Sequence, residues 1–423
     1  MSHPLHSAEQ VLEQLGRLPG GPELLAQARR REDVALVGGA IRDALLGHWP
    51  RELDVTVATD SAGLAAALAS AISPGERAYG RAVEPVLHER FGTASVAWQY
   101  GRIDIAERRA ESYPAPGALP EVRPGSFEDD LRRRDFTVNA IALPLHGAEN
   151  EGLVSVEGAL DDLHAGLLRV LHEESFRDDP TRILRLARYA ARLKFEIEPH
   201  TRELAGQAVQ GGALETVSGD RIGAELWLAA RETDGAAAFG VLDSLGVLAA
   251  LGMPSPFDDD LFREAEALLP DDGSRALLLL GVALYPASAL EITHSLGFTR
   301  EQWTTVVQVA HGADKGAETL LGLPATMPVL EGADAELVAL AGALAERESE
   351  GAAQAARDWL TTHRHVRLDI DGGDLIAAGI PEGPEIGLRL AVTLQLKREG
   401  RVSGREQELR EALGVEPSLP AEL

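Results

Sequence analysis

The chain has 423 residues and a mass of 45.1 kDa, which is too long for one compact core, so two or three domains are expected. Its 45% hydrophobic and 25% charged residues are typical of a folded globular protein and exclude a disordered or fibrous chain. There are 40 Lys and Arg against 67 Asp and Glu, and no Cys. The net charge of −27 argues against a polyanionic partner, and disulfides, thiolate nucleophiles and Cys-ligated metals are excluded.

The first residues, MSHPLHSAEQ, lack the charged and apolar regions of a secretory signal. No later run of about 18 apolar residues is long enough to span a bilayer. With no Cys, signal or spanning segment, the protein is expected in the cytoplasm, with no membrane partner.

Strand and helix patterns mix between about residue 33 and residue 143. Short β-branched runs at 34–37, 53–57, 93–98 and 102–106 predict strands, while 41–46 and 61–71 have helical spacing. Beyond about residue 175 the strand pattern nearly vanishes, and Ala- and Leu-rich helical segments are separated by Gly and Pro clusters. The sequence therefore predicts an α/β head followed by an all-α remainder.

Two adjacent glycines, Gly38 and Gly39, end the first strand pattern and precede a helical one. Paired glycines let the backbone approach a phosphate closely, and the free N–H groups of a helix N-terminus attract an anion. A plain tight turn explains the same residues equally well, so both interpretations stay open at this point.

The next strand pattern carries Asp54 and Thr56 two residues apart, which puts both side chains on one face of the strand. An acidic strand face beside a phosphate-binding turn is an arrangement that brings Mg²⁺ to a nucleotide. The strand therefore favours the nucleotide-binding interpretation of the glycine turn.

Three ordered stretches of the chain resemble one known family. They are VGGAIRDALLG at 37–47 with LDVTVAT at 53–59, RRRDFTVNAIAL at 132–143, and RDDPTRILRLARYAARLKFEI at 177–197. Together they resemble the class II tRNA nucleotidyltransferases and bacterial poly(A) polymerases, which add nucleotides without a template. The segment 372–410 is also similar to the C-terminal helices of that family.

The resemblance implies a nucleotidyltransferase head with a mixed β-sheet at 1–145 and a base-recognising neck at 146–235. A helical body at 236–350 and a tRNA-binding helical tail at 351–423 would follow. It also implies an enzyme that adds C and/or A to the 3′ end of tRNA, with Mg²⁺ as cofactor and CTP and/or ATP as substrates. No oligomeric state is implied.

In the family pattern, two Asp residues on the acidic strand hold the metal. This chain keeps Asp54 but has Thr56 at the second position, and a neutral hydroxyl is a weaker Mg²⁺ ligand. Asp104, on the strand pattern at 102–106, is the candidate for an added carboxylate, and Asp60 is a poorer one; an exposed charge explains Asp104 equally well. Asp54 and Asp104 are thus the expected catalytic residues, with Thr56 as a third metal position.

The resemblance also implies contacts to the ribose and the triphosphate. Guanidinium groups suit phosphates, and Asp and Asn side chains can hydrogen-bond a ribose hydroxyl. The nucleotide-binding residues expected in the head are Gly38, Gly39, Arg42, Arg134, Asp135 and Asn139.

The stretch at 177–197 is expected to recognise the base. A well-capped helix start explains Asp178, Asp179 and Pro180 without any function. The resemblance implies more: Asp179 and Arg182 read the edge shared by cytosine and adenine, where an amine donor lies beside a ring-nitrogen acceptor. Arg185 and Arg188 continue along the same helix and are expected near the triphosphate or the RNA backbone.

Two further features accompany these motifs. Arg221 and Glu225, four residues apart, are expected to brace the base-recognising helix, or to form an ordinary helical ion pair. Basic residues near the C-terminus predict a local basic surface for RNA with steep salt sensitivity. They are Arg389, Lys397, Arg398, Arg401 and Arg405.

The product is left open. The proline-rich segment 107–120 takes the place of a loop that relatives need for A addition, so CCA, CC and A addition are all compatible with the sequence. A bacterial poly(A) polymerase is the second interpretation, because the head motifs are shared. A catalytically silent tRNA-binding homologue is the third, because of Thr56.

Overall fold

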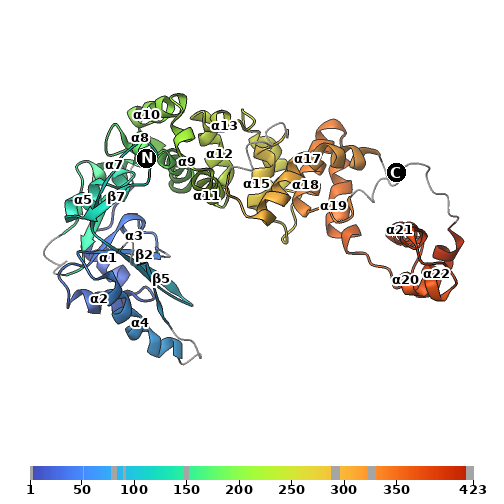
Figure 1. Cartoon of the computed structure of the whole chain (residues 1–423), viewed down its shortest axis with the longest axis horizontal. Helices are drawn as coiled ribbons and strands as arrows, with labels where there is room; N and C mark the ends of the chain where they lie inside the picture. The colour runs from blue at the N-terminus through green and yellow to red at the C-terminus, as the bar shows by residue number, and fades with distance from the viewer. Residues whose placement is uncertain are drawn as a thin grey trace. The chain divides into compact units, whose positions relative to one another are not determined.

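The computed structural model describes residues 3–50, 52–77, 83–88, 92–146, 152–286, 296–322 and 330–415. The chain divides into two compact units, Met1–Leu251 and Gly252–Leu423 (Figure 1). Among the described residues, none of the helices has the length and apolar composition to cross a membrane.

A seven-stranded mixed sheet forms the centre of the head (Figure 1). Its spatial order is β3-β4-β5-β2-β1-β8-β9, and β2 and β5 are parallel while the other neighbours are antiparallel. The strands are β1 (Ala35–Val37), β2 (Glu52–Val57), β3 (Pro85–His88), β4 (Thr93–Trp98), β5 (Gly101–Glu107), β8 (Ile141–Pro144) and β9 (Val154–Ser155). All four predicted strands are present, and the register places Asp54 directly beside Asp104.

Short helices pack around this sheet. Ser7 and Ser126 begin two of them with capping boxes, in which the hydroxyl accepts the third backbone N–H of the helix. The helices of the head are α1 (Ala8–Leu15), α2 (Gly21–Ala28), α3 (Gly38–Leu45), α4 (Ser61–Arg77), α5 (Phe127–Arg132) and the 3₁₀ turn η2 (Thr137–Asn139). A separate hairpin, β6 (Arg109–Ser112) with β7 (Glu121–Pro124), occupies most of the segment that the sequence left as a proline-rich loop.

The rest of the first unit is helical. Its elements are α7 (Ala159–Ala165), α8 (Ser175–Asp178), α9 (Thr181–Leu193), α10 (Pro199–Gln210), η3 (Ala213–Thr216), α11 (Gly219–Ala230), α12 (Gly235–Ser244) and α13 (Val247–Ala250), with a parallel pair of β10 (Leu167–Leu168) and β11 (Glu196–Ile197). Helix α9 packs against α11 and α12, and Phe239 and Leu242 of α12 are fully buried. The unit therefore extends past residue 235, where the sequence placed the end of the neck.

The second unit is built from helices throughout its described residues. They are α14 (Asp259–Glu266), α15 (Arg275–Ala283), α17 (Arg300–Gly322), α18 (Ala335–Glu348), α19 (Ala352–Thr361), η5 (His363–His365), α20 (Gly372–Ala377), α21 (Pro384–Arg398) and α22 (Arg405–Gly414). Trp359 and Leu360 of α19 join Val338 of α18 in one core, and Leu375 and Ala412 belong to a smaller core in the tail. A mixed sheet followed by helices confirms the predicted fold class.

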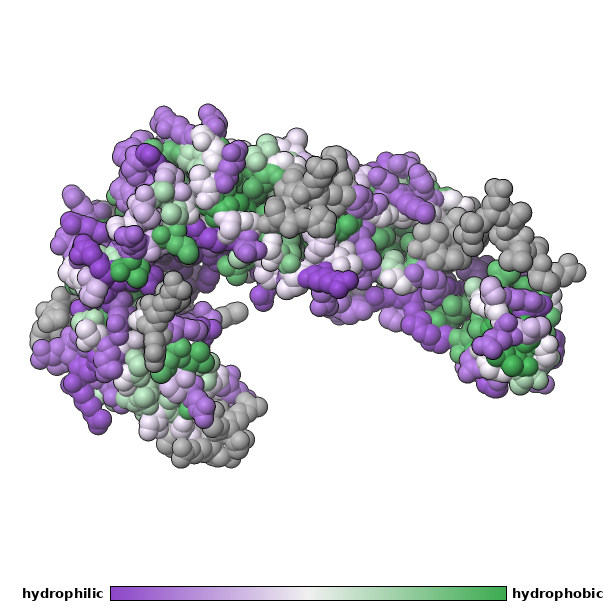
Figure 2. Space-filling model, viewed as in Figure 1, coloured by the Kyte–Doolittle hydropathy of each residue, from purple (hydrophilic) through white to green (hydrophobic). Residues whose placement is uncertain are grey.

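Each of the five cations of the predicted basic surface of the tail has an acidic partner, although Arg401 and Arg405 stay 67% and 62% exposed. Arg389 is buried, bonds Glu385 at 2.6 Å and donates to the carbonyl oxygen of Ala412. The other pairs are Lys397 with Asp369 and Glu408, Arg398 with Glu331, Arg401 with Glu399, and Arg405 with Asp374. Figure 2 shows hydrophobic residues beside hydrophilic ones on the visible face of the tail. The sequence shows which residues are cations and acids, but not which acid pairs with which cation after folding.

Candidate functional site

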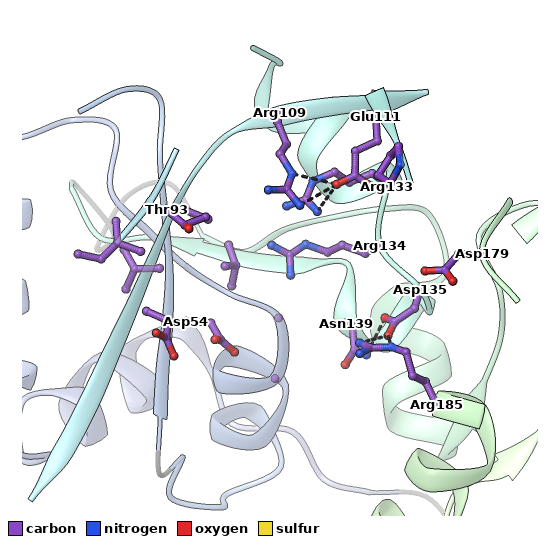
Figure 3. Close-up of a pocket in the computed structure, with 18 of the residues that line it drawn as sticks. Asp54, Thr93, Arg109, Glu111, Arg133, Arg134, Asp135, Asn139, Asp179 and Arg185 are labelled. Carbon is purple, nitrogen blue, oxygen red and sulfur yellow. Dashed lines mark hydrogen bonds and ion pairs between the residues drawn. The ribbon is translucent and has the colours of Figure 1, made fainter. Parts of the chain in front are cut away.

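Most of the predicted site residues line one cavity of the first unit. Its volume is about 640 Å³, and it is lined by the β1–α3 turn, β2, β5, the β6–β7 hairpin, residues 133–139 and the start of α9. Figure 3 shows Asp54 of the sheet and Asp179 of the segment before α9 on opposite sides of it. The predicted residues that line it are Gly38, Gly39, Asp54, Asp104, Arg134, Asp135, Asn139, Asp179, Arg182 and Arg185.

At the glycine turn, the backbone of Gly38 and Gly39 lines the cavity directly. Gly38 has a φ of +65°, which side chains disfavour, and a Cβ there would lie 2.8 Å from Nη1 of Arg134. A Cβ on Gly39 would lie 3.7 Å from Oδ2 of Asp54. The turn is therefore more than a tight connection, because a side chain at Gly38 would crowd the guanidinium of Arg134, whereas a Cβ at Gly39 would only make ordinary contact.

Asp54 and Asp104 form a carboxylate pair on neighbouring strands. They are register partners in the parallel β2–β5 pair, so their side chains leave the same face of the sheet. Burial raises the pKa of Asp54 to about 6, with Asp104 adding to the rise and Arg134 opposing it. Asp104 also bonds Arg102 at 2.8 Å.

This pair suits a hard cation that keeps some of its ligands from water or substrate. Mg²⁺ is held in proteins by one or two carboxylates together with substrate phosphates. No third His, Asp or Glu joins the pair to form a larger metal-binding cluster among the described residues. Burial is the main cause of the raised pKa of Asp54 and Asp104 adds to it; a divalent cation would favour the ionised carboxylates, so the donor set fits Mg²⁺.

Thr56 and Asp60 do not reach the cavity. Thr56 is 1% exposed, and its hydroxyl donates to the carbonyl oxygen of Ala106 at 3.1 Å. Asp60 lies beyond the strand and bonds Arg31 at 3.3 Å. Thr56 thus fastens β2 to β5, and the expectation that it takes a metal position is not supported by its geometry.

Arg134 is oriented toward the glycine turn by a buried acid. Asp130 is 1% exposed and accepts from Arg134 at 3.0 Å and from Arg133 at 2.7 Å. The two guanidinium groups hold the pKa of Asp130 below its ordinary value against the opposing effect of burial. Nη1 of Arg134 then lies beside Gly38, where it can donate to a phosphate.

Asp135 connects the head to helix α9. Its Oδ2 accepts from Arg185 at 2.6 Å and its Oδ1 from Asn139 at 2.9 Å (Figure 3). Although burial opposes it, Arg185 and Asn139 lower the pKa of Asp135 to about 2. Asn139 in turn accepts from Arg42 at 2.6 Å. The ribose-contact candidates therefore belong to one rigid ion-pair network.

Two predicted nucleotide contacts lie outside this cavity. Arg42 is 1% exposed and lies beneath it, where it bonds Asn139 and Asp43. Arg188 is buried and pairs with Glu225 at 3.3 Å and Glu232 at 3.6 Å. Both guanidinium groups are therefore held by internal partners, which are Asn139 and the adjacent Asp43 for Arg42 and two acids distant in sequence for Arg188.

Asp179 and Arg182 line the cavity at the start of α9. The Oδ1 of Asp179 accepts from the Thr181 hydroxyl at 2.6 Å, and its Oδ2 accepts from no described residue. Arg182 donates to Ser175 at 2.7 Å and to the carbonyl oxygen of Arg133 at 2.9 Å. With its longer bond to Tyr113, Arg182 uses three of its five N–H groups, so part of its donor capacity stays available.

The hairpin supplies site residues that the sequence motifs did not reveal. Arg109, Glu111 and Tyr113 line the cavity, as does Arg133. Glu111 accepts from Arg109 at 2.9 Å and from Arg133 at 3.2 Å (Figure 3). The alternation of three polar residues two positions apart was the signal for one face of a strand, and the nearby prolines concealed it.

Arg221 and Glu225 brace the base-recognising helix, as the first of the two expectations has it, and do not pair with each other: Glu225 lies 3.4 Å from Arg185 and 3.3 Å from Arg188, while Arg221 holds Asp179. The Nη2 of Arg221 donates to Oδ1 of Asp179 at 2.8 Å, and its Nη1 donates to the carbonyl oxygen of Gly117 at 3.2 Å. Gly117 has a φ of +68°, and a Cβ there would lie 2.1 Å from the Thr216 hydroxyl. One guanidinium therefore joins α11, the hairpin connection and the acid before α9.

The assembled cavity has three chemically different walls. The glycine turn and Arg134 can bind phosphates, the carboxylate pair can hold a divalent cation, and Asp179 with Arg182 presents an acceptor beside donors. An acceptor beside a donor matches the edge of cytosine or adenine. The arrangement suits a nucleoside triphosphate and its metal.

Comparison with known proteins agrees with this geometry. A family model described as the poly A polymerase head domain matches residues 34–169. A CC-adding tRNA nucleotidyltransferase of Deinococcus radiodurans is 33% identical over 413 residues, which cover 93% of this chain and 93% of the relative. An A-adding tRNA nucleotidyltransferase of Halalkalibacterium halodurans is 38% identical over 255 residues, which cover 59% of this chain but only 56% of that relative.

The fold is matched over the same length. The solved structure of the Thermotoga maritima CCA-adding enzyme complexed with tRNA aligns with a TM-score of 0.75 and 27% identity, over 97% of this chain and 98% of that one. With a relative of 33% identity aligned over 93% of both chains, and a head that holds the carboxylate pair and the glycine turn, the chain belongs to the tRNA nucleotidyltransferase family.

Proposed function

We propose that the protein is a template-independent tRNA nucleotidyltransferase that adds C, A or both to the 3′ end of tRNA, with CTP and/or ATP as substrates and Mg²⁺ as cofactor. The observation that carries this proposal is the single cavity in which phosphate, metal and base-edge groups face one another. The relatives that add CC, A or CCA support it.

Asp54 and Asp104 are the proposed Mg²⁺ ligands. When bound, the metal neutralises the triphosphate and favours ionisation of the attacking 3′-hydroxyl. Gly38 and Arg134 supply the N–H groups around the phosphates, and Asp130 keeps Arg134 in place. Because Asp104 provides the second carboxylate, the proposal does not need an acid at position 56.

Base choice is proposed to rest on Asp179 and Arg182. The free Oδ2 of Asp179 would accept from the exocyclic amine of cytosine or adenine, and Arg182 would donate to the adjacent ring nitrogen. Uracil and guanine present a carbonyl oxygen in place of the amine, which would face a carboxylate with acceptor against acceptor. Arg221 is a positioning residue in this scheme, since it fixes the carboxylate of Asp179.

The remaining assignments follow from the family. The tail at 351–423 is proposed to contact tRNA through groups other than its five paired cations, because the Deinococcus relative aligns over 93% of the chain. The cytoplasm stays a prediction. A poly(A) polymerase is the alternative function, favoured by the description of the matching head model.

An incorporation assay tests the proposal. The full chain is incubated with Mg²⁺, one labelled nucleoside triphosphate and one of three RNAs: tRNA without CCA, tRNA ending in CC, or an unstructured oligonucleotide. Two residues from CTP on the first RNA show CC addition, and one residue from ATP on the second shows A addition. Long ATP tracts on the oligonucleotide would favour the polymerase, and no label with any RNA or divalent metal would refute the enzyme.

A further inference from the structure

A second cavity meets the nucleotide cavity at Asp54. Its volume is about 710 Å³, and it lies entirely within the first unit. Gly39, Asp54 and Tyr189 line both cavities. The second one is otherwise formed by the C-terminal half of α3 and the turn after it, the start of β2, the end of α9 and residues 231–233.

Nucleotidyl transfer needs an attacking and a leaving oxygen that are roughly in line through the reacting phosphorus. The attacking hydroxyl therefore has to approach the metal from the side opposite the departing pyrophosphate. Asp54 lines both the nucleotide cavity and the second cavity, so both are adjacent to the proposed metal ligand. The second cavity is therefore the candidate site for the RNA end that carries the attacking hydroxyl.

We propose that this second cavity, the acceptor groove, binds the single-stranded 3′ end of the RNA, with Trp49 as a stacking surface for one of its last bases. This inference rests on the proposed function and assigns the groove that its second substrate occupies.

Trp49 is the residue with the chemistry for this role. It is 53% exposed, although a large apolar ring in water is unfavourable unless a ligand covers it. It follows a turn in which Gly47 has a φ of +78° and the backbone N–H of His48 donates to the carbonyl oxygen of Asp43 at 2.8 Å. Exposed aromatic rings bind single-stranded bases by stacking, without reading their sequence.

The charges of the groove are nearly balanced. Arg231 is exposed and makes no ion pair with another described residue, while Arg192 is 3.6 Å from Asp43. Glu232 is 3.6 Å from Arg188, and Glu52 is exposed at the start of β2. Phosphate contacts are therefore few, and stacking on Trp49 has to carry a large part of the affinity for the RNA end.

Direct binding measures the groove without turnover. A stem-loop RNA that ends as tRNA does without CCA is titrated into the full chain with a metal chelator and no nucleotide. Trp49→Ala should weaken binding about tenfold, within the range for loss of one stacked base, while Trp49→Phe should stay within about threefold. Tyr100→Ala is the matched control, since Tyr100 is a 58% exposed aromatic residue of the head that lines neither cavity.

Steady-state kinetics show whether the loss in Trp49→Ala concerns RNA binding or nucleotide binding. Trp49→Ala should raise KM for the RNA about tenfold and leave KM for CTP unchanged, because the ring lies outside the nucleotide cavity. Arg231→Ala should lower the salt slope of RNA binding by about one unit, as loss of one phosphate contact requires.

The two proposals fail in different ways. If Trp49→Ala binds the RNA as the parent does, or no more weakly than Tyr100→Ala, or if only KM for CTP rises, the acceptor groove is refuted even when incorporation is normal. If the parent incorporates nothing but Trp49→Ala still loses RNA affinity, the groove stands and the transferase does not. A parent that does not bind the RNA refutes both.

Discussion

The nucleotide cavity and the tail are both rich in arginine, and they use it in opposite ways. In the cavity, Asp130 holds Arg134 so that its Nη1 lies beside the glycine turn, and Arg182 keeps part of its donor capacity. In the tail, Arg389 is buried against Glu385 and the end of α22. The same side chain thus serves a ligand in one region and the fold in the other, and the difference lies in whether a donor remains after the internal partners are satisfied.

The largest difference between the two regions is expected in catalytic activity, on substitution of the cavity carboxylate Asp54. Asp54→Asn should lower the incorporation rate by about 10³-fold or more, because the metal stabilises several kcal/mol of transition-state charge. Its thermal unfolding should stay close to that of the parent. Asp60→Asn, a substitution beside the same strand but away from the cavity, should retain full activity; comparable losses in both variants would contradict the assignment of Asp54.

The buried network of the cavity should also matter for stability. Asp135→Asn leaves Arg185 with a weaker partner and should lower the free energy of unfolding by about 3 kcal/mol, the low end for a broken buried pair. The pKa of Asp135 is lowered from 3.8 to about 2, so its contribution is complete above 3.8 and is lost only as the pH falls through about 2. Denaturant unfolding should therefore show the same gap between parent and variant from about pH 8 to about pH 5; a gap that closes in this interval would show that Asp135 is not the group held ionised.

In the tail, the effect should be on the fold alone. Glu408 is fully buried and bonds Lys397 at 2.5 Å and the backbone N–H of Asp369 at 2.6 Å. Glu408→Gln should destabilise the tail by about 2 kcal/mol, less than a fully buried pair because Lys397 is partly exposed. Hydrogen exchange of the amides at 369–412 should then accelerate about thirtyfold, while exposed Glu406→Gln changes nothing. Unchanged exchange in Glu408→Gln would remove the structural role given to this cluster.

A smaller effect is expected where an arginine positions a base-reading acid. Arg221→Met frees the carboxylate of Asp179 and should reduce the preference for CTP over UTP about tenfold, at the low end of what a base-edge pair discriminates. The ratio of kcat/KM for the two nucleotides measures it. Arg202→Met, an exposed arginine of the same unit on α10, is the control, and equal selectivity in the two variants would separate Arg221 from base choice.

The smallest effect should come from a tail arginine that faces water. Arg405 is 62% exposed but bonds Asp374 and the carbonyl oxygen of Asp369. Arg405→Gln should leave the salt slope of RNA binding unchanged, in contrast to the drop of about one unit expected for Arg231→Ala. A similar drop in both variants would restore the tail as a basic RNA surface.

The head could be predicted well because its signals are local. The strand of Asp54, the glycine turn and the helix after it each follow from side-chain periodicity within ten residues, and the proposal of Asp104 needed only a neighbouring strand. The partners of arginines could not be predicted in this way. Arg42 meets Asn139 and Arg188 meets Glu225 only after folding, and no pattern in the sequence separates such residues from Arg134.

The β6–β7 hairpin is a second feature that local sequence patterns could not predict. Arg109 and Tyr113 lie in a segment whose prolines favoured an irregular loop, and the pairing with β7 that turns them into a cavity wall joins residues on either side of those prolines. The sequence placed a proline-rich loop at 107–120, where the first strand of a short antiparallel pair forms.

The positive φ of Gly38 has a consequence for how the protein can change over generations. An ion pair in the tail can drift, since Arg405 and Asp374 can be lost together or exchange signs at little cost to the rest of the chain. Gly38 has no such route: every other amino acid carries a Cβ, and that atom would meet both the disfavoured backbone angle and the guanidinium of Arg134. Any amino-acid substitution at this position therefore alters the cavity, whereas the tail pair tolerates exchange.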